Sequence, residues 1–233
     1  SALAAREKGL PLVNIAQPFK SSGMMLTCRK DMGVNSTDDL KGKTLGVWFY
    51  GNEYPFLSWM SRLGLATDGS ANGVTVLKQG WGVEPLTEGQ AACVSTMSYN
   101  EYWVVRDAGY TPEQLTVFKY QAEGASTLED GLYVLEKNLG DDSFKDKMVR
   151  FVRASMKGWK YAEANPKEAA SIILDNDDAG VQTEKHQIRM VGEIAKLTAG
   201  SNGSLDPSDY ERTVKVLMSG ASDPVITKEP SGA

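Results

Sequence analysis

Cysteine and histidine are scarce in this chain, and their scarcity limits the chemistry that it can carry. The 233 residues include two cysteines, Cys28 and Cys93, and one histidine, His186. The cysteines lie in separate apolar segments without a CxxC spacing, so we expect no metal site and no other cofactor. Both are interpreted as buried free thiols, with a disulfide as the less favoured alternative. His186 lies among charged residues of a late helix, where a surface position is expected.

An excess of positive charge is also missing. The net charge is -5, so no basic face is available for a nucleic acid. The longest apolar runs are far too short for a membrane-spanning helix. No G-x-S-x-G, Walker or dinucleotide-binding motif is present, and we predict no catalytic residues. The composition, 41% hydrophobic and 24% charged, is typical of a soluble globular protein with one large or two small domains.

Strand patterns dominate the first part of the chain, and helix patterns dominate the second. We expect strands at residues 12–16, 24–29, 45–48, 74–78, 91–97, 115–120 and 132–136, with helices at 1–9, 52–63 and 99–108. A long helix capped by Asp142 should carry Phe144, Met148, Phe151, Val152, Met156 and Trp159 on one face. Strand–helix alternation followed by a helical tail predicts an α/β protein.

Two strand ends carry the same set of side chains. The strand at 45–48 leads through Tyr50 and Gly51 to Asn52 and Glu53 at the start of a helix. The strand that ends at residue 97 is followed in the same way by a tyrosine, an asparagine and a glutamate. Ligands of open α/β sheets bind outside the carboxyl ends of the strands. The sequence therefore predicts a small-molecule pocket.

Each of these residues also has a purely structural interpretation. Asn52 and Glu53 can cap a helix, and the two interpretations of this pair carry equal weight. Asn100 and Glu101 have the same ambiguity, but the tyrosines on either side of them favour ligand binding. A planar ligand can stack on such rings while the carboxylate accepts a hydrogen bond from an amino group of the ligand.

The tryptophans divide between packing and binding. Trp59 and Trp159 lie on apolar helix faces and are assigned to the core. Trp48 ends a strand and Trp81 lies between two glycines, so packing and ligand binding are equally weighted for both. Glu123 is a weaker candidate, in the segment that follows the strand expected at residues 115–120. The predicted ligand-binding residues are Trp48, Tyr50, Gly51, Asn52, Glu53, Trp81, Tyr99, Asn100, Glu101 and Glu123.

Two further stretches resemble a known protein family. Residues 39–43, Asp-Leu-Lys-Gly-Lys, resemble the entry into the second lobe of the type 2 periplasmic solute-binding proteins, and residues 156–169 resemble their C-terminal helix pair. Within that family the chain is most similar to the branch that contains the thiamine-pyrimidine-precursor receptors and the related pyrimidine synthase. The receptors for nitrate, sulfonates and taurine belong to the same branch. In that branch an asparagine–glutamate pair follows the strand that here ends at Met97.

The resemblance implies a two-lobed α/β fold of the Venus flytrap type. Lobe I would comprise residues 1–36 and 124–233, and lobe II would be the inserted residues 37–123. The family's N-terminal segment of lobe I is not in the sequence, and the chain opens inside a helical pattern, so we expect a processed or truncated start and exposed apolar surface. The implied function is that of a monomeric receptor, periplasmic or lipid-anchored, which delivers a small pyrimidine-like ligand to an ABC permease and its ATPase subunits.

Three alternatives remain open. A pyrimidine-synthase-like enzyme of the same fold needs a histidine donor and a cysteine-rich iron site, and this chain is poor in both residues. A receptor for a sulfonate or nitrate would depend on helix N-termini and hydroxyls, because Arg62 and Lys78 are the only basic residues between residues 44 and 105 and neither falls in a proposed pocket loop. A sensory domain could bind its ligand in the cleft between the two implied lobes.

Overall fold

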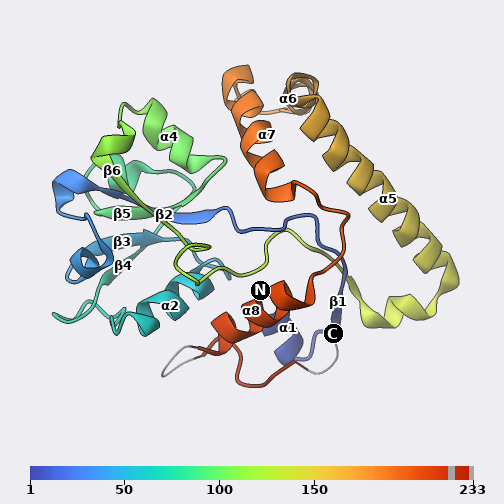
Figure 1. Ribbon diagram of the computed structural model, residues 1–233, viewed down its shortest axis with the longest axis horizontal. Helices are drawn as coiled ribbons and strands as arrows, with labels where there is room; N and C mark the ends of the chain where they lie inside the picture. The colour runs from blue at the N-terminus through green and yellow to red at the C-terminus, as the bar shows by residue number, and fades with distance from the viewer. Residues whose placement is uncertain (220–223, 231–233) are drawn as a thin grey trace. The chain divides into compact units, whose positions relative to one another are not determined.

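A computed structural model describes residues 1–219 and 224–230, and the chain divides into two compact units (Figure 1). Unit 1 contains Ser1, Gly23–Thr127 and the chain from Glu211 onward, whereas unit 2 contains Ala2–Ser22 and Leu128–Tyr210. These bounds differ from the expected lobes. Strand β2 (Met24–Arg29) belongs to unit 1, because it pairs with two strands there.

Unit 1 is built on a five-stranded sheet in the order β4-β3-β5-β2-β6. Besides β2, its strands are β3 (Thr44–Val47), β4 (Thr75–Lys78), β5 (Cys93–Met97) and β6 (Leu115–Lys119). β3 runs parallel to β4 and β5, and β2 runs antiparallel to β5 and β6. The carboxyl ends of β3, β4, β5 and β6 therefore lie at the same edge of the sheet.

Two apolar clusters pack on this sheet, because successive residues of a strand face opposite sides. Trp59 of α2 (Glu53–Arg62), 1% exposed, lies in the cluster that contains Cys93. Val105 of α4 (Glu101–Asp107) and Leu86 of α3 (Glu84–Thr87) lie in the cluster that contains Val94. Burial on both sides specifies the register of β5, because a one-residue slip would exchange the two faces. The core assignment of Trp59 is confirmed.

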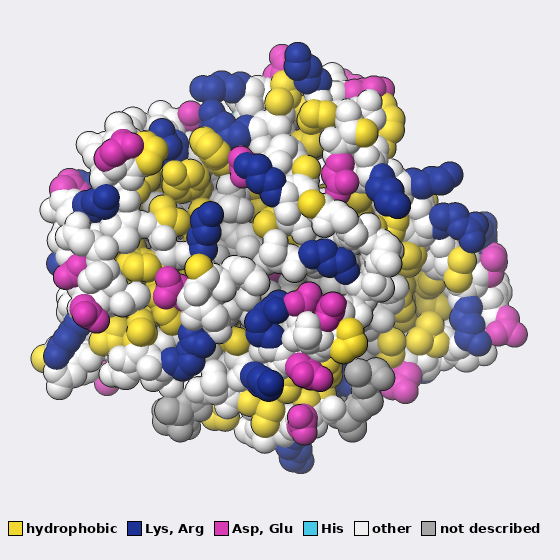
Figure 2. Space-filling view, viewed as in Figure 1, with side chains coloured by type: hydrophobic (Ala, Val, Ile, Leu, Met, Phe, Trp, Pro, Cys, Tyr) yellow, Lys and Arg dark blue, Asp and Glu magenta, His cyan; other side chains and the backbone are white. Residues whose placement is uncertain are grey.

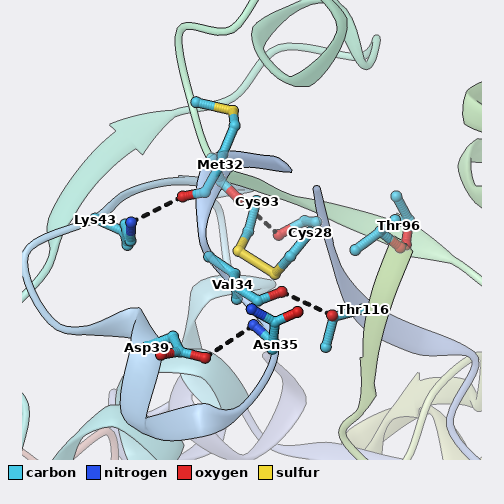
Figure 3. The surroundings of a disulfide bond; sticks show 12 residues. Cys28, Met32, Val34, Asn35, Asp39, Lys43, Cys93, Thr96 and Thr116 are labelled. Carbon is cyan, nitrogen blue, oxygen red and sulfur yellow. Dashed lines mark hydrogen bonds between the residues drawn. A yellow bond between two sulfur atoms is a disulfide. The ribbon is translucent and has the colours of Figure 1, made fainter. Parts of the chain in front are cut away.

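Cys28 and Cys93 form a disulfide (Figure 3), so the interpretation of both as free thiols was wrong. The two residues lie directly opposite each other on the antiparallel strands β2 and β5. The N–H of Arg29 donates to the C=O of Ala92, so the cysteines occupy a non-hydrogen-bonded pair, where facing side chains approach most closely. They are 65 residues apart in the sequence, and only the pairing of two non-consecutive strands brings them together.

Unit 2 combines a two-stranded antiparallel sheet with helices. Its strands are β1 (Leu12–Ala16) and β7 (Leu132–Leu135), and its helices are α1 (Ala2–Glu7), α5 (Asp142–Ala164), α6 (Pro166–Asp175) and α7 (Glu184–Thr198). Helix α8 (Pro207–Met218) begins in unit 2 and continues into unit 1. Short 3-10 turns lie at Lys30–Met32, Thr37–Leu40, Pro112–Gln114 and Glu136–Gly140. All predicted strands and the late helices are thus confirmed, with shifts of one or two residues at their ends.

The long helix α5 differs from its prediction in two ways. Its N-cap is Asp141 rather than Asp142, because the Asp141 carboxylate accepts the Ser143 N–H at 2.8 Å. None of its residues is buried, and Phe151 on the predicted apolar face is 52% exposed. Trp159, assigned to the core, is half-buried and packs edge-on against the Phe19 ring with the ring centroids 5.6 Å apart.

The surface carries charged side chains of both signs (Figure 2). On the face shown in Figure 2, Lys and Arg side chains are interspersed with Asp and Glu. Among the helices within residues 1–219 and 224–230, none combines the length and the apolar character needed to cross a membrane.

Candidate functional site

Most of the predicted ligand-binding residues follow strand ends at one edge of the unit 1 sheet. Trp48, Tyr50, Gly51, Asn52 and Glu53 follow β3, Trp81 follows β4, and Tyr99, Asn100 and Glu101 follow β5. Because β4, β3 and β5 are neighbours, the structure places these three groups side by side. We call residues 48–53, 78–82 and 97–101 the strand-end surface. The chain passes from β3 out to β4 and returns to β5 on the other side of β3, and α/β proteins bind ligands at such switch points.

On the β3 side, an unusual backbone conformation exposes a tyrosine. Tyr50 has φ of 66° and is followed by Gly51 with φ of 106°, and 87% of the Tyr50 side chain is exposed. A carboxylate oxygen of Glu53 accepts the Gly51 N–H at 2.7 Å and stabilises this turn. Asn52 occupies the N-cap position of α2 without a side-chain capping bond, and its amide donates to the Phe49 C=O at 3.4 Å.

On the β5 side, Glu101 closes the turn between strand and helix. Its carboxylate accepts the Met97 N–H at 2.9 Å and the Asn100 side-chain amide at 2.8 Å. The residue is half-buried. Burial raises the pKa of the Glu101 carboxyl, and these hydrogen bonds oppose the increase. A carboxylate has about four acceptor positions, so Glu101 keeps capacity for a donor on a ligand.

The raised pKa of Glu101 predicts a pH-dependent stability difference. A folded-state pKa above the unfolded one means that the folded protein binds more protons between the two values, so the contribution of Glu101 to stability falls as pH rises through that interval. We therefore expect the stability of Glu101→Gln relative to wild type, measured by urea unfolding, to increase as the pH rises from 4 to 7. Asp39→Asn is the control of opposite sign at lower pH, because hydrogen bonds from the Asn35 and Ser36 N–H groups lower the pKa of Asp39 below its ordinary value of 3.8. A difference between Glu101→Gln and wild type that does not change with pH would contradict this prediction.

On the β4 side, Lys78 contacts the candidate residue Tyr50, a contact that the sequence interpretation missed. Its ammonium nitrogen lies 4.7 Å from the centroid of the Tyr50 ring and 5.6 Å from that of Phe49, and it donates to the Tyr50 hydroxyl at 3.2 Å. Lys78 is the last residue of β4 and so lies outside the loops proposed from the sequence, but its side chain reaches the Tyr50 ring. Lys78 pairs with Val47, the last residue of β3, so its position could be found only once β4 was known to lie beside β3.

Glu123 follows β6 and is held at a different place. Arg62 at the end of α2 donates to the backbone C=O of Glu123 at 2.5 Å and to that of Gly124 at 2.8 Å. A ten-residue helix such as α2 is about 15 Å long. The structure therefore joins the Glu123 backbone to the end of α2 that is remote from Asn52, and not to the strand-end surface.

The strand-end surface offers groups for binding. It carries exposed aromatic rings, carboxylates, side-chain amides and one ammonium group. Within residues 1–219 and 224–230, no group of three or more His, Cys, Asp and Glu side chains is placed to hold a metal ion. His186 is half-buried in the first turn of α7, in unit 2.

Comparisons with known proteins add evidence on family. A family model described as NMT1/THI5 like matches residues 1–169. The formylaminopyrimidine-binding protein of Halalkalibacterium halodurans is 23% identical over 222 residues, which cover 92% of this chain and 65% of that protein. The chain thus spans slightly less than two thirds of the length of this relative.

Solved structures add evidence on fold. The periplasmic aliphatic sulphonate binding protein SsuA from Escherichia coli matches with a TM-score of 0.62 and 12% identity, covering 94% of this chain and 66% of that chain. The ligand binding component of an ABC-type import system from Staphylococcus aureus matches with a TM-score of 0.61 and 14% identity, covering 92% and 70%. At such low identity the likeness shows the fold, and it confirms the predicted type 2 periplasmic-binding-protein fold. These relatives are binding proteins rather than enzymes.

Proposed function

Because the chain belongs to the NMT1/THI5-like family, we propose that it is the solute-binding component of an ABC-type importer and that it captures a small, pyrimidine-like ligand. The observation that carries this proposal is the strand-end surface, where Tyr50, Trp81 and Glu101 follow three neighbouring strands of one sheet. Aromatic rings beside a hydrogen-bonding carboxylate suit a flat heterocycle that bears N–H donors.

Backbone strain at Tyr50 supports a binding role. A tyrosine with positive φ is uncommon, and such strained conformations cluster at binding and active sites. The side chain of Tyr50 is also mostly exposed, so core packing does not explain the conformation. Among the relatives compared, the formylaminopyrimidine-binding protein has a name that points to the same ligand class.

A second ligand class is favoured by Lys78. Its ammonium group beside the Tyr50 hydroxyl could hold a sulfonate or another small anion. The sequence alone made an anionic ligand less favourable, because no basic residue fell in a proposed pocket loop. This second candidate uses the same surface and would be a receptor as well.

We also propose an extracytoplasmic location, in the periplasm or at a lipid anchor, and delivery of the ligand to a membrane permease with ATPase subunits. The buried Cys28–Cys93 disulfide supports this location, because disulfides persist in oxidising compartments. The receptor would act as a monomer and release its ligand unchanged, in contrast to a pyrimidine-synthase-like enzyme.

Calorimetry with a formylaminopyrimidine tests the proposal. We expect saturable binding with one ligand per chain, and mass spectrometry should return the ligand unchanged. Glu101→Gln should weaken binding by roughly 10- to 100-fold, because a charge-assisted hydrogen bond contributes about 1.5–3 kcal/mol. The glutamine keeps an acceptor for the Met97 N–H, which an alanine would leave without a partner.

The matched control is the same pyrimidine without its nitrogen substituent, whose affinity should change little in Glu101→Gln. Recovery of a converted product would contradict the receptor proposal. Equal losses of affinity for the two ligands would contradict the hydrogen bond assigned to Glu101.

A further inference from the structure

Gln79, directly after β4, makes a pair of hydrogen bonds to a strand that is not its neighbour. Its side-chain oxygen accepts the Ser95 N–H at 2.8 Å, and its side-chain nitrogen donates to the Ser95 C=O at 3.0 Å. Ser95 belongs to β5, and β3 lies between β4 and β5. The backbone pairing of β3 with β5 covers Cys93 and Val94, so the Gln79 amide continues the ladder of β5 where that pairing ends. Gln79 is accordingly only 6% exposed.

Gly46 of β3 provides the space for this side chain. A Cβ atom at position 46 would lie 3.2 Å from the side-chain oxygen of Gln79 and 2.9 Å from a methyl carbon of Val94. A glycine inside a strand often marks such a close approach of another group. The glycine in the middle of β3 and the glutamine after β4 are thus two parts of one arrangement.

The same glutamine fastens the loop that carries Trp81. Its side-chain nitrogen also donates to the Gly82 C=O at 3.1 Å, while the indole N–H of Trp48 donates to the Gly80 C=O at 2.9 Å. The backbone is therefore held on both sides of Trp81, yet 97% of the Trp81 side chain is exposed. Tryptophan is usually largely buried. A held backbone that presents a fully exposed indole is suited to a preformed contact with a ligand.

We propose that Gln79 is a positioning residue, which holds the 79–82 loop so that the Trp81 indole is preorganised to stack on a planar nitrogen heterocycle. This inference rests on the proposed function. Gln79 does not touch the ligand itself. It orders the loop before binding, so less conformational freedom is lost when the ligand arrives. Because the amide is anchored on β5, it also ties the Trp81 loop to the strand that leads to Glu101.

A double-mutant cycle measured by calorimetry with a formylaminopyrimidine tests this role. Trp81→Ala and Gln79→Met should each weaken binding by about tenfold, the order of an aromatic stacking contact. If Gln79 acts through Trp81, the double variant should bind no more weakly than Trp81→Ala alone. Losses that add in the double variant would overturn the proposal. Should Gln79→Met not fold, Gln79→Glu replaces it, since that side chain keeps the acceptor but not the donors.

A fluorine NMR measurement separates this inference from the proposed function. In protein labelled with 5-fluorotryptophan, the Trp81 resonance is identified by its loss in Trp81→Phe. We expect it to shift on addition of the pyrimidine, and to move and sharpen in ligand-free Gln79→Met as the loop becomes mobile. Binding heat without a shift of the Trp81 resonance would overturn the inference and leave the receptor proposal intact. An unchanged Trp81 resonance in ligand-free Gln79→Met would overturn the inference about Gln79, whether or not the pyrimidine binds. Absence of binding heat would instead count against the proposed function.

Discussion

Removal of the Cys28–Cys93 disulfide should lower the free energy of unfolding by about 4 kcal/mol. The cross-link joins residues that are 65 positions apart, and closing a loop of this length removes much of the conformational entropy of the unfolded chain. Both cysteines are fully buried, on the neighbouring interior strands β2 and β5. Loss of the bond therefore acts on the whole of unit 1 rather than on a loop.

Urea unfolding with and without a phosphine reductant measures this contribution. The reduced wild type keeps both sulfur atoms in the core, so it separates the effect of the cross-link from that of lost volume. The Cys28→Ala/Cys93→Ala variant should be destabilised at least as much and should not respond to the reductant. The same unfolding midpoint for oxidised and reduced wild type would show that the bond adds nothing to stability.

Trp59→Ala should cost about 3–5 kcal/mol of unfolding free energy, because it empties a large volume in a packed core. The Trp59 ring is 1% exposed and lies 5.5 Å, between ring centroids, from both Phe118 and Tyr120. These contacts join α2 to the segment around β6, so the cavity would open between two elements of the core.

Trp81→Ala is the matched control, because it makes the same chemical change at a side chain that is 97% exposed. Its unfolding free energy should stay within about 0.5 kcal/mol of wild type. Both variants can be followed by the same urea titration, monitored by circular dichroism. Similar losses for the two variants would contradict the assignment of Trp59 to the core and of Trp81 to the surface.

Local pattern was enough to predict most of the secondary structure and the α/β class, whereas the two-lobed fold was implied by the family resemblance. The segments of β2 and β5 are short and apolar, and the helices after residue 141 have an apolar repeat, so each could be recognised without its partners. The grouping of Tyr50 with Glu101 was predicted for a related reason. Both follow buried strands, and parallel strands bring such ends to one edge of a sheet.

The sequence by itself therefore determined the elements, their α/β order and the two strand ends that make up most of the candidate site. Only the tertiary structure decided the disulfide, the place of Lys78 beside Tyr50, and the reach of Gln79 across Gly46 to Ser95. Each of these depends on which strands are neighbours and in what register. Strand order and register are set by packing between segments far apart in the chain, and periodicity within one segment does not contain that information.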